Sequence, residues 1–549
     1  MKRLMKMRNE NGMALSTVLI VGFILMSMTG ATMHYAVAEM DISRHDQDWN
    51  AALAAAEAGI DDYIFRVNND NGYWALGNAD PANLAMTKWK SVAGSTNEGK
   101  FTYTVDTSHI GLDGTIDITS SGKVDDAART VQASVRPRHF LDFLYFTDYE
   151  TVDPIVYPIL YGVSSTWANS NCVKYRFAAD PRDDPGCHNI QFAAGDVIKG
   201  PLHTNDAILV GANVSGSAAQ FRGNVTTNWP GVPDGSTTRR WWYTGSKPNP
   251  FFARAGDPHF GSNIEMPVAV TELRAKALPS QGGCVYQGPT RIVLNSGGTM
   301  SVTSPLTPVG PNFCTVGNNR PLPANGVVYV DNVPTPGAGI TPPPVSPACP
   351  SATPSRNRLG YPIAGDLTTY GCSTGDVFLK GALKGRLTIA AKNRLVITDD
   401  VTYATTDSLL GLIAENTVEV YHPVDCTNND GSCDLARTAV DGGGLFDNAR
   451  ISAAILSLTH SFYVQNFNRG DRDNLDYLFV NGAIAQKFRG AVGTSGSSGT
   501  GYLKDYTYDQ RLKYISPPEF LDPVNSAWQV GTWAEVQPNA GHKARVLAP

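Results

Sequence analysis

Two apolar patterns follow each other at the start of the chain. An uncharged run extends from Met13 to Met33, 21 residues. As an α-helix it would span about 32 Å, enough to cross the hydrocarbon core of a bilayer. Beyond it, apolar residues recur at spacings of three and four, as on one face of a helix, and no proline occurs before Pro81. The pattern predicts one continuous helix over residues 13–70, with residues 13–35 in the membrane. The recurring apolar residues are Ala52, Leu53, Ala56, Ile60, Tyr63, Ile64 and Val67.

The pattern changes to strict alternation after the predicted helix. In KFTYTVDTS, Phe101, Tyr103 and Val105 fall on one face of a strand, and GTIDITSSG and ARTVQASVRPR alternate in the same way. We therefore expect a small antiparallel sheet, packed on the helix, within residues 71–147. The aromatic stretch RHFLDFLYFTDYE at the end of this region would join it to a second domain.

From residue 148 onward, short apolar pairs recur every eight to ten residues between Gly, Asn and Asp turns. Val377/Leu379, Leu387/Ile389 and Leu395/Ile397 are examples. Regular short strands without helical segments predict a mainly-β domain, either a parallel β-solenoid or a β-sandwich, and the run of glycine, apolar pair and Asn or Asp favours the solenoid. The expected organisation is a first solenoid part over 148–227, a Pro/Gly-rich insertion with short strands over 228–360, and a second solenoid part with a C-terminal wrap over 361–549. The fold class is thus α+β in its N-terminal part, followed by this β-rich domain.

The charge distribution argues against one class of function and predicts the orientation of the chain in the membrane. The formal net charge is -6, and basic residues cluster only at Lys2, Arg3, Lys6 and Arg8. Nucleic-acid binding is not expected, because it needs clustered Lys and Arg to neutralise phosphates. The basic residues precede the apolar run, so the N-terminus should stay cytoplasmic and the remainder should be exported.

The cysteines fit an exported domain. None forms a CxxC pair, so disulfides are expected rather than a zinc site. Spacing alone cannot choose among the pairings. Sequential neighbours are the working hypothesis, and Cys426–Cys433 is favoured because VDCTNNDGSCDL is rich in turn formers. The eight residues are Cys172, Cys187, Cys284, Cys314, Cys349, Cys372, Cys426 and Cys433.

The N-terminus also resembles a known family. The basic leader MKRLMKMRNENG, ending in Gly12 and followed by MALSTVLIVGFIL, is similar to a type IV prepilin, and AALAAAEAGIDDYI resembles the corresponding stretch of PilX-like minor pilins. The resemblance implies cleavage by a prepilin peptidase between Gly12 and Met13, often with methylation of the new N-terminus. It also implies a filament of pilins packed through this helix, an inner-membrane assembly platform, and a final extracellular location on a pilus.

Three residues of the predicted membrane helix bear on filament packing. Gly22 and Gly30 would let another helix approach closely. Pilins that build a filament body usually carry Glu five residues after the cleavage point, where this chain has Thr17. A hydroxyl cannot neutralise the buried ammonium of a neighbouring subunit. Thr17 is therefore either a tolerated polar residue or the mark of a subunit that ends a stack.

The sequence offers few residues that could form a metal site or a catalytic site. Asp471, Asp473 and Asp476 are calcium candidates, but Asp is also favoured in turns. His203, near Asn205 and Asp206, is expected to be a structural residue with satisfied polar groups. The sequence contains no established catalytic motif, so we expect neither an enzyme nor a cofactor beyond such structural calcium. The functional hypotheses are a minor pilin at a filament tip or in an initiation complex, a membrane-anchored surface adhesin that binds a surface ligand, and a polysaccharide-active β-helix enzyme.

Overall fold

The chain divides into two compact units in the computed structural model, residues 1–137 with 527–549 and residues 138–526. We call the first the helix–sheet unit and the second the head. The structure describes residues 13–70, 73–94, 98–108, 115–137, 140–182, 186–214, 217–267, 269–334, 356–363, 365–427, 433–435, 447–470, 475–494, 499–521 and 528–537.

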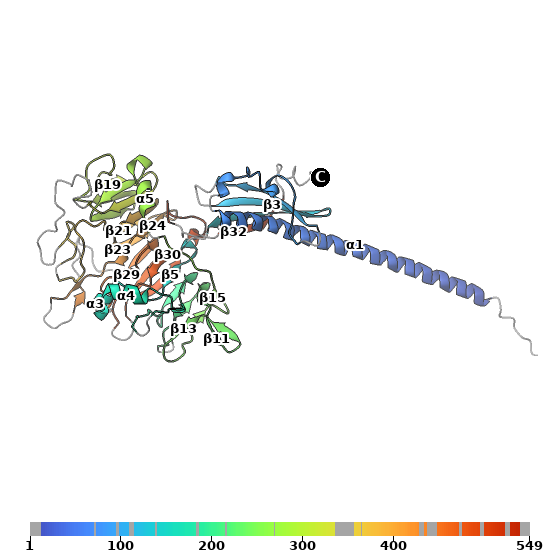
Figure 1. The fold of residues 1–549 in the computed structure, drawn as a ribbon, viewed down its shortest axis with the longest axis horizontal. Coiled ribbons are helices and arrows are strands. Elements are labelled where there is room, and N and C mark those ends of the chain that lie inside the picture. The colour runs from blue at the N-terminus through green and yellow to red at the C-terminus, as the bar shows by residue number, and fades with distance from the viewer. Residues whose placement is uncertain are drawn as a thin grey trace, which may run out of the picture. The chain divides into compact units, whose positions relative to one another are not determined.

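The helix–sheet unit contains one long helix and a five-stranded antiparallel sheet (Figure 1). Helix α1 covers Met13–Asn69 without a break. The sheet has the order β1-β2-β3-β4-β32, and the outermost strand comes from the far end of the chain. The strands are β1 (Lys90–Ser91), β2 (Lys100–Asp106), β3 (Ile116–Val124), β4 (Ala127–Pro137) and β32 (Trp528–Glu535).

The second half of α1 packs on this sheet. The helix buries Ala56, Ile60 and Tyr63 in the same apolar cluster as Phe101 and Tyr103 of β2, so the two sequence periodicities meet in one core. The approach is close at Gly122 of β3. A Cβ added there would lie 2.2 Å from the carbonyl oxygen of Ala52 and from the backbone nitrogen of Ala56. Glycine is required at this position by the contact between two backbones.

The C-terminal strand differs from the expected domain organisation. Residues 361–549 were expected to end as a wrap on the β-rich domain, but β32 pairs with β4 in antiparallel register, with Trp528 opposite Pro137. The indole of Trp528 enters the core of the helix–sheet unit. The head is therefore an insertion between two neighbouring strands. The first boundary also differs, because residues 138–147 belong to the head.

The head is built from stacked parallel strands. One ladder contains β16, β20, β22, β24, β28, β30, β5, β7, β10 and β15 in spatial order, all paired in parallel. Its strands are Cys284–Gln287, Val327–Asp331, Arg386–Ala391, Leu409–Ala414, Arg450–Ser457, Tyr477–Phe488, Tyr145–Tyr149, Leu202–Thr204, Val225–Thr227 and His259–Phe260, respectively.

Two further parallel ladders run alongside. The second contains β17 (Thr290–Asn295), β21 (Val377–Leu383), β23 (Leu395–Tyr403), β25 (Val418–Val420) and β29 (Phe462–Val464). The third extends from β30 through β31 (Leu503–Tyr508), β6 (Val197–Lys199) and β9 (Gln220–Phe221) to β14 (Phe251–Phe252).

The smaller elements are edge strands, hairpins and short helices next to these ladders. Strands β18 (Thr299–Thr303) and β19 (Gly317–Pro321) add antiparallel edges to β17, and β8 (Ile208–Leu209) pairs in parallel with β13 (Trp241–Trp242). The hairpins are β11 (Val232–Asp234) with β12 (Thr237–Arg239) and β26 (Val424–Asp425) with β27 (Asp434–Leu435). The short helices are α3 (Tyr157–Tyr161), α4 (Ser165–Cys172) and α5 (Thr271–Lys276).

The spatial order of the strands is a permutation of their chain order. The chain enters the stack at β5, in its middle, and continues through β7 and β10 to β15 at one end. It resumes at β16 at the other end and returns to β30, which pairs with β5. The range 228–360, expected to be an insertion, thus contains β16 and β20, which are integral members of the stack.

Aligned apolar side chains fill the interior of the stack. In the first ladder, Ile389, Leu412, Ile455, Ile484 and Tyr145 occupy successive register positions, and all are buried. The apolar pairs recognised in the sequence thus stack on their equivalents one strand away. The register continues across the β30–β5 junction without interruption.

Disulfides close loops of the head. The bonds Cys172–Cys187, Cys284–Cys314 and Cys426–Cys433 are three of the expected sequential pairs. Cys372 is also disulfide-bonded, and Cys349 lies outside the described residues.

Candidate functional site

The first half of α1 is apolar and exposed. Leu15, Phe23 and Met26 expose 71%, 77% and 76% of their surface, and this part of the helix is apolar enough to cross a membrane. The hydroxyl groups of Ser27, Thr29 and Thr32 are satisfied within the helix, as where Oγ1 of Thr29 donates to the carbonyl of Leu25 at 2.7 Å. A helix whose hydroxyl groups bond to its own carbonyls and whose apolar side chains are exposed suits lipid or the apolar surface of another helix.

The residues predicted to act in processing and packing lie at the start of this surface. Gly12 is outside the described residues, and Met13 is the first residue of α1. Thr17 lies on the exposed part of the helix. A Cβ placed on Gly22 or Gly30 would meet no atom within 4 Å, so both positions are open to a neighbouring helix.

The junction between β5 and β30 contains buried charge. Nη1 of Arg489 donates to Oε2 of Glu150 at 2.8 Å, and both side chains are fully buried. The Arg489 guanidinium also lies over the ring of Phe192, 3.4 Å from its centroid. Nearby, Nζ of Lys504 lies 3.0 Å from Oδ2 of Asp196, and burial lowers the pKa of this lysine. These pairs join residues that come from opposite ends of the head sequence.

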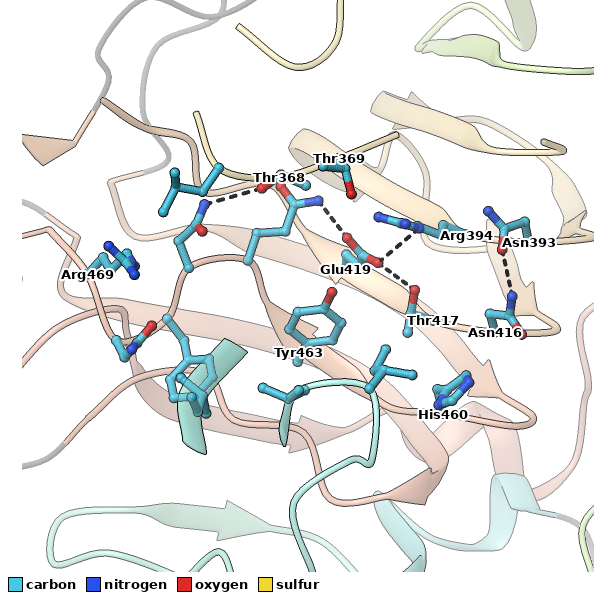
Figure 2. Close-up of a pocket in the computed structure, with 18 residues that line it drawn as sticks. Thr368, Thr369, Asn393, Arg394, Asn416, Thr417, Glu419, His460, Tyr463 and Arg469 are labelled. Carbon is cyan, nitrogen blue, oxygen red and sulfur yellow. Dashed lines mark hydrogen bonds and ion pairs between the residues drawn. The ribbon is translucent and has the colours of Figure 1, made fainter. Parts of the chain in front are cut away.

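A pocket of about 410 Å³ lies over β25 and β29 (Figure 2). Ile155, Val156 and Leu160, in and before α3, form an apolar side. Leu367 and Thr369 contribute to its lining from another segment. The pocket volume lies within the range of about 300–1,000 Å³ that is typical of small-molecule sites.

A buried carboxylate organises the pocket. Glu419 exposes 1% of its side chain and lies between Val418 and Val420, whose side chains face the core. It accepts hydrogen bonds from Oγ1 of Thr417 at 2.5 Å and from Nε2 of Gln465 at 2.6 Å. Nε of Arg394 lies 3.8 Å from Oε1 of the same carboxylate. Figure 2 shows Arg394 and Thr417 on either side of the Glu419 carboxylate, joined to it by dashed lines.

The charges in this cluster stabilise one another. Burial opposes the charge on Arg394, but Glu419 and Asp376 hold the pKa of its guanidinium above the ordinary value. Burial, and then the negative charge of Glu419, raise the pKa of the Tyr463 hydroxyl. The tyrosine therefore stays neutral and the arginine stays charged throughout the physiological pH range.

A ladder of polar side chains forms another side of the pocket. Nδ2 of Asn416 donates to Oδ1 of Asn393 at 2.6 Å, and Asn393 donates in turn to Asp376. Oγ1 of Thr459 donates to Oδ1 of Asn416 at 3.0 Å. Asn393, Asn416 and Thr459 follow the consecutive strands β22, β24 and β28, so the parallel register places their side chains in contact.

The other candidate residues from the sequence are held by packing and hydrogen bonds within the fold, as residues with a structural role are. His203 lies in β7, where its ring stacks on Phe146 and contacts Oγ1 of Thr226 at 2.8 Å. Asp476 accepts from Asn448 at 3.4 Å, and Asp471 and Asp473 lie outside the described residues. Within the described ranges, no group of three His, Cys, Asp or Glu side chains could hold a metal ion.

The pocket residues were not identified from the sequence. Arg394 and Glu419 lie in short strand–turn segments that look like their neighbours, and they meet only because parallel strands align in register. An acidic residue between two core valines was the one local signal. It predicts an outward side chain, but not the segment that covers it.

Comparisons with known proteins add little. No protein-family model matches the chain, and the search of curated proteins found no match. Among solved structures, the competence-associated pilin ComZ from Thermus thermophilus is similar over 89% of this chain and 97% of that chain, with 12% identity and a TM-score of 0.25. A likeness at that level carries no argument about this protein.

Proposed function

We propose that this protein is a minor pilin, a subunit of a type IV-type filament. The observation that carries the proposal is the division of α1, whose first half is apolar and exposed while its second half is buried on an antiparallel sheet. Leaving the bilayer is favourable for such a helix only if another apolar surface covers it. The helices of neighbouring subunits would supply that surface, with the assembly platform as a membrane partner.

The proposed location within the filament is the tip or the initiation complex. Thr17 lacks the carboxylate that would neutralise the N-terminus of a neighbouring subunit. In addition, the sheet carries all of residues 138–526 as an insertion between β4 and β32, which we propose to be a β-solenoid. A subunit that adds so large a head would obstruct regular packing along a shaft.

The proposal is tested first by the mass of the mature protein. We expect a chain that begins at Met13, methylated at its new N-terminus after cleavage by a prepilin peptidase. A Gly12→Leu variant is the control and should retain its leader. An intact Met1 in the wild-type protein, or a cut near Ala31, would exclude the pilin interpretation.

The location is tested by immunogold labelling of sheared filaments. We expect gold at filament ends for the wild-type protein, and uniform labelling along the shaft would contradict the tip assignment. A Thr17→Glu variant tests whether the missing carboxylate causes the location at the tip, because it introduces a carboxylate without altering the head. If Thr17 determines the position, this variant should also label the shaft.

The pocket of the head favours a second candidate, a surface adhesin held by an uncleaved anchor. In that case the leader would remain and the pocket would provide the function. We propose binding rather than catalysis, without a cofactor. Glu419 is the single carboxylate among the described residues that line this pocket, whereas glycoside hydrolysis generally requires two.

A further inference from the structure

The pocket over β25 and β29 is lined by polar side chains that use only part of their hydrogen-bonding capacity within the protein. Arg394 is partly accessible, and its guanidinium is held by charge, with Nε 3.8 Å from Glu419. Among the described residues, no side chain accepts a hydrogen bond from this guanidinium. Tyr463, Asn393 and Asn416 are also partly exposed. These planar groups surround one cavity of about 410 Å³.

The charge distribution selects the class of ligand. Beside the asparagine ladder the charges are paired, because Arg394 faces Glu419 and His460 lies 2.8 Å from Asp153. The other cation of the lining, Arg469, lies at the opposite end of the pocket, with Nη1 3.0 Å from Sγ of Cys433 (Figure 2). An anionic ligand near Arg394 would therefore also meet negative charge, and a cationic ligand would meet the guanidinium. At this end of the pocket, bringing either ion out of water would therefore not be offset by an unpaired charge of opposite sign among the described lining residues.

We propose that this pocket binds a neutral hexose unit of a polysaccharide. Neighbouring sugar hydroxyls can accept from Arg394 and exchange hydrogen bonds with the amides of Asn393 and Asn416. The ring of Tyr463 and the side chains of Val156 and Leu160 supply an apolar surface for the C–H face of the sugar. Glu419 does not contact the sugar. It is a positioning residue that orients Arg394, Thr417 and Gln465.

The inference depends only on the head. It holds whether the N-terminal helix enters a filament or stays in the membrane as an anchor. Its failure would therefore leave the pilin proposal intact, and an uncleaved leader would leave the sugar site intact.

The test uses the full chain in a zwitterionic detergent, because detergents with sugar head groups would compete for the pocket. Binding is measured to surfaces coated with dextran or mannan, which are neutral, with alginate, which is anionic, and with chitosan, which is cationic. We expect retention on at least one neutral polymer, and weaker retention on both charged polymers. Free neutral oligosaccharide should displace the protein.

Two matched pairs of variants locate the site. Thr369→Trp places an indole at the exposed rim without touching the buried pairs, and should abolish retention; Thr238→Trp, on the exposed hairpin of β11 and β12, should not. Arg394→Gln should weaken binding roughly tenfold by removing charge-assisted donors. Arg386→Gln, at an exposed position of β22, is its control.

The outcomes are decisive in both directions. Retention on a neutral polymer that Thr369→Trp abolishes, with Thr238→Trp unaffected, supports the proposal. No retention on any neutral polymer overturns it. A preference for alginate or chitosan also overturns it, as does a Thr369→Trp variant that binds as well as the wild-type protein.

Discussion

Nη1 of Arg489 donates a hydrogen bond of 2.8 Å to Oε2 of Glu150, although 339 residues separate the two along the chain. The pair lies where β30 meets β5, the point at which the two halves of the permuted stack join. Neither side chain is exposed. A buried ion pair thus joins the first and last parts of the head where the two halves of its stack meet.

Removing one partner of this pair should destabilise the head strongly. Arg489→Met would leave the Glu150 carboxylate buried without its counter-charge, and we expect a loss of about 3–5 kcal/mol in the free energy of unfolding. Urea denaturation of the full chain measures this loss. The double variant Glu150→Gln/Arg489→Met should recover a large part of it.

The control for this prediction is an exposed ion pair of the head. Lys276 and Glu519 lie 3.4 Å apart, with side chains 56% and 43% exposed. Lys276→Met should change the free energy of unfolding by less than about 1 kcal/mol. A similar small effect for Arg489→Met would show that the β5–β30 junction does not hold the stack together.

The C-terminal strand should stabilise the helix–sheet unit through Trp528. Its side chain is 6% exposed, and its backbone N–H donates to Oδ1 of Asn68 at 2.6 Å. Trp528→Ala should lower the free energy of unfolding of this unit by about 3–5 kcal/mol. Trp533 is on the same strand but 45% exposed, so Trp533→Ala should have a far smaller effect. Equal effects in thermal denaturation would contradict the pairing of β32 with β4.

The sequence predicted those parts of the fold that depend on local periodicity. Spacings of three and four placed the helix, which ends at Asn69, and alternation placed the strand around Tyr103. Each signal is contained in one segment, because a segment with one buried face needs only its own period to show it. The N-terminal helix and the first sheet were therefore within reach of sequence reasoning.

The sequence did not show which distant strands pair with each other. The stretch from Trp528 to Glu535 has apolar positions, but a shift in register between Val530 and Thr532 breaks their alternation. Nothing local indicates that it should join β4. The same holds for Arg394 and Glu419, whose meeting depends on the parallel register of β23 and β25. Contacts between distant segments, rather than residue preferences, decide these features.

The contact between α1 and β3 predicts a strict requirement for glycine at one position. In Gly122→Ala, the added methyl group would collide with backbone atoms of Ala52 and Ala56, so the helix would have to move away. Overpacking of this kind costs about 1–3 kcal/mol. Gly531→Ala is a control in the same unit, because its Cβ would make an ordinary contact of 3.4 Å with Ser134. Circular dichroism on heating should show a lower melting temperature for Gly122→Ala alone.

A buried histidine should make the stability of the head depend on pH. His422 is 1% exposed, and burial lowers its pKa from 6.5 to about 4. As the pH falls below 6.5, the unfolded chain takes up a proton that the folded chain does not, so stability is fully present above that pH and declines toward pH 4. The slope should be about 1 kcal/mol per pH unit between pH 6 and pH 5. His422→Gln removes the titrating group, so urea denaturation of this variant should show a flatter pH profile over that interval. Equal slopes for the two proteins would mean that folding does not lower the pKa of His422, so that the folded head takes up the proton as readily as the unfolded chain.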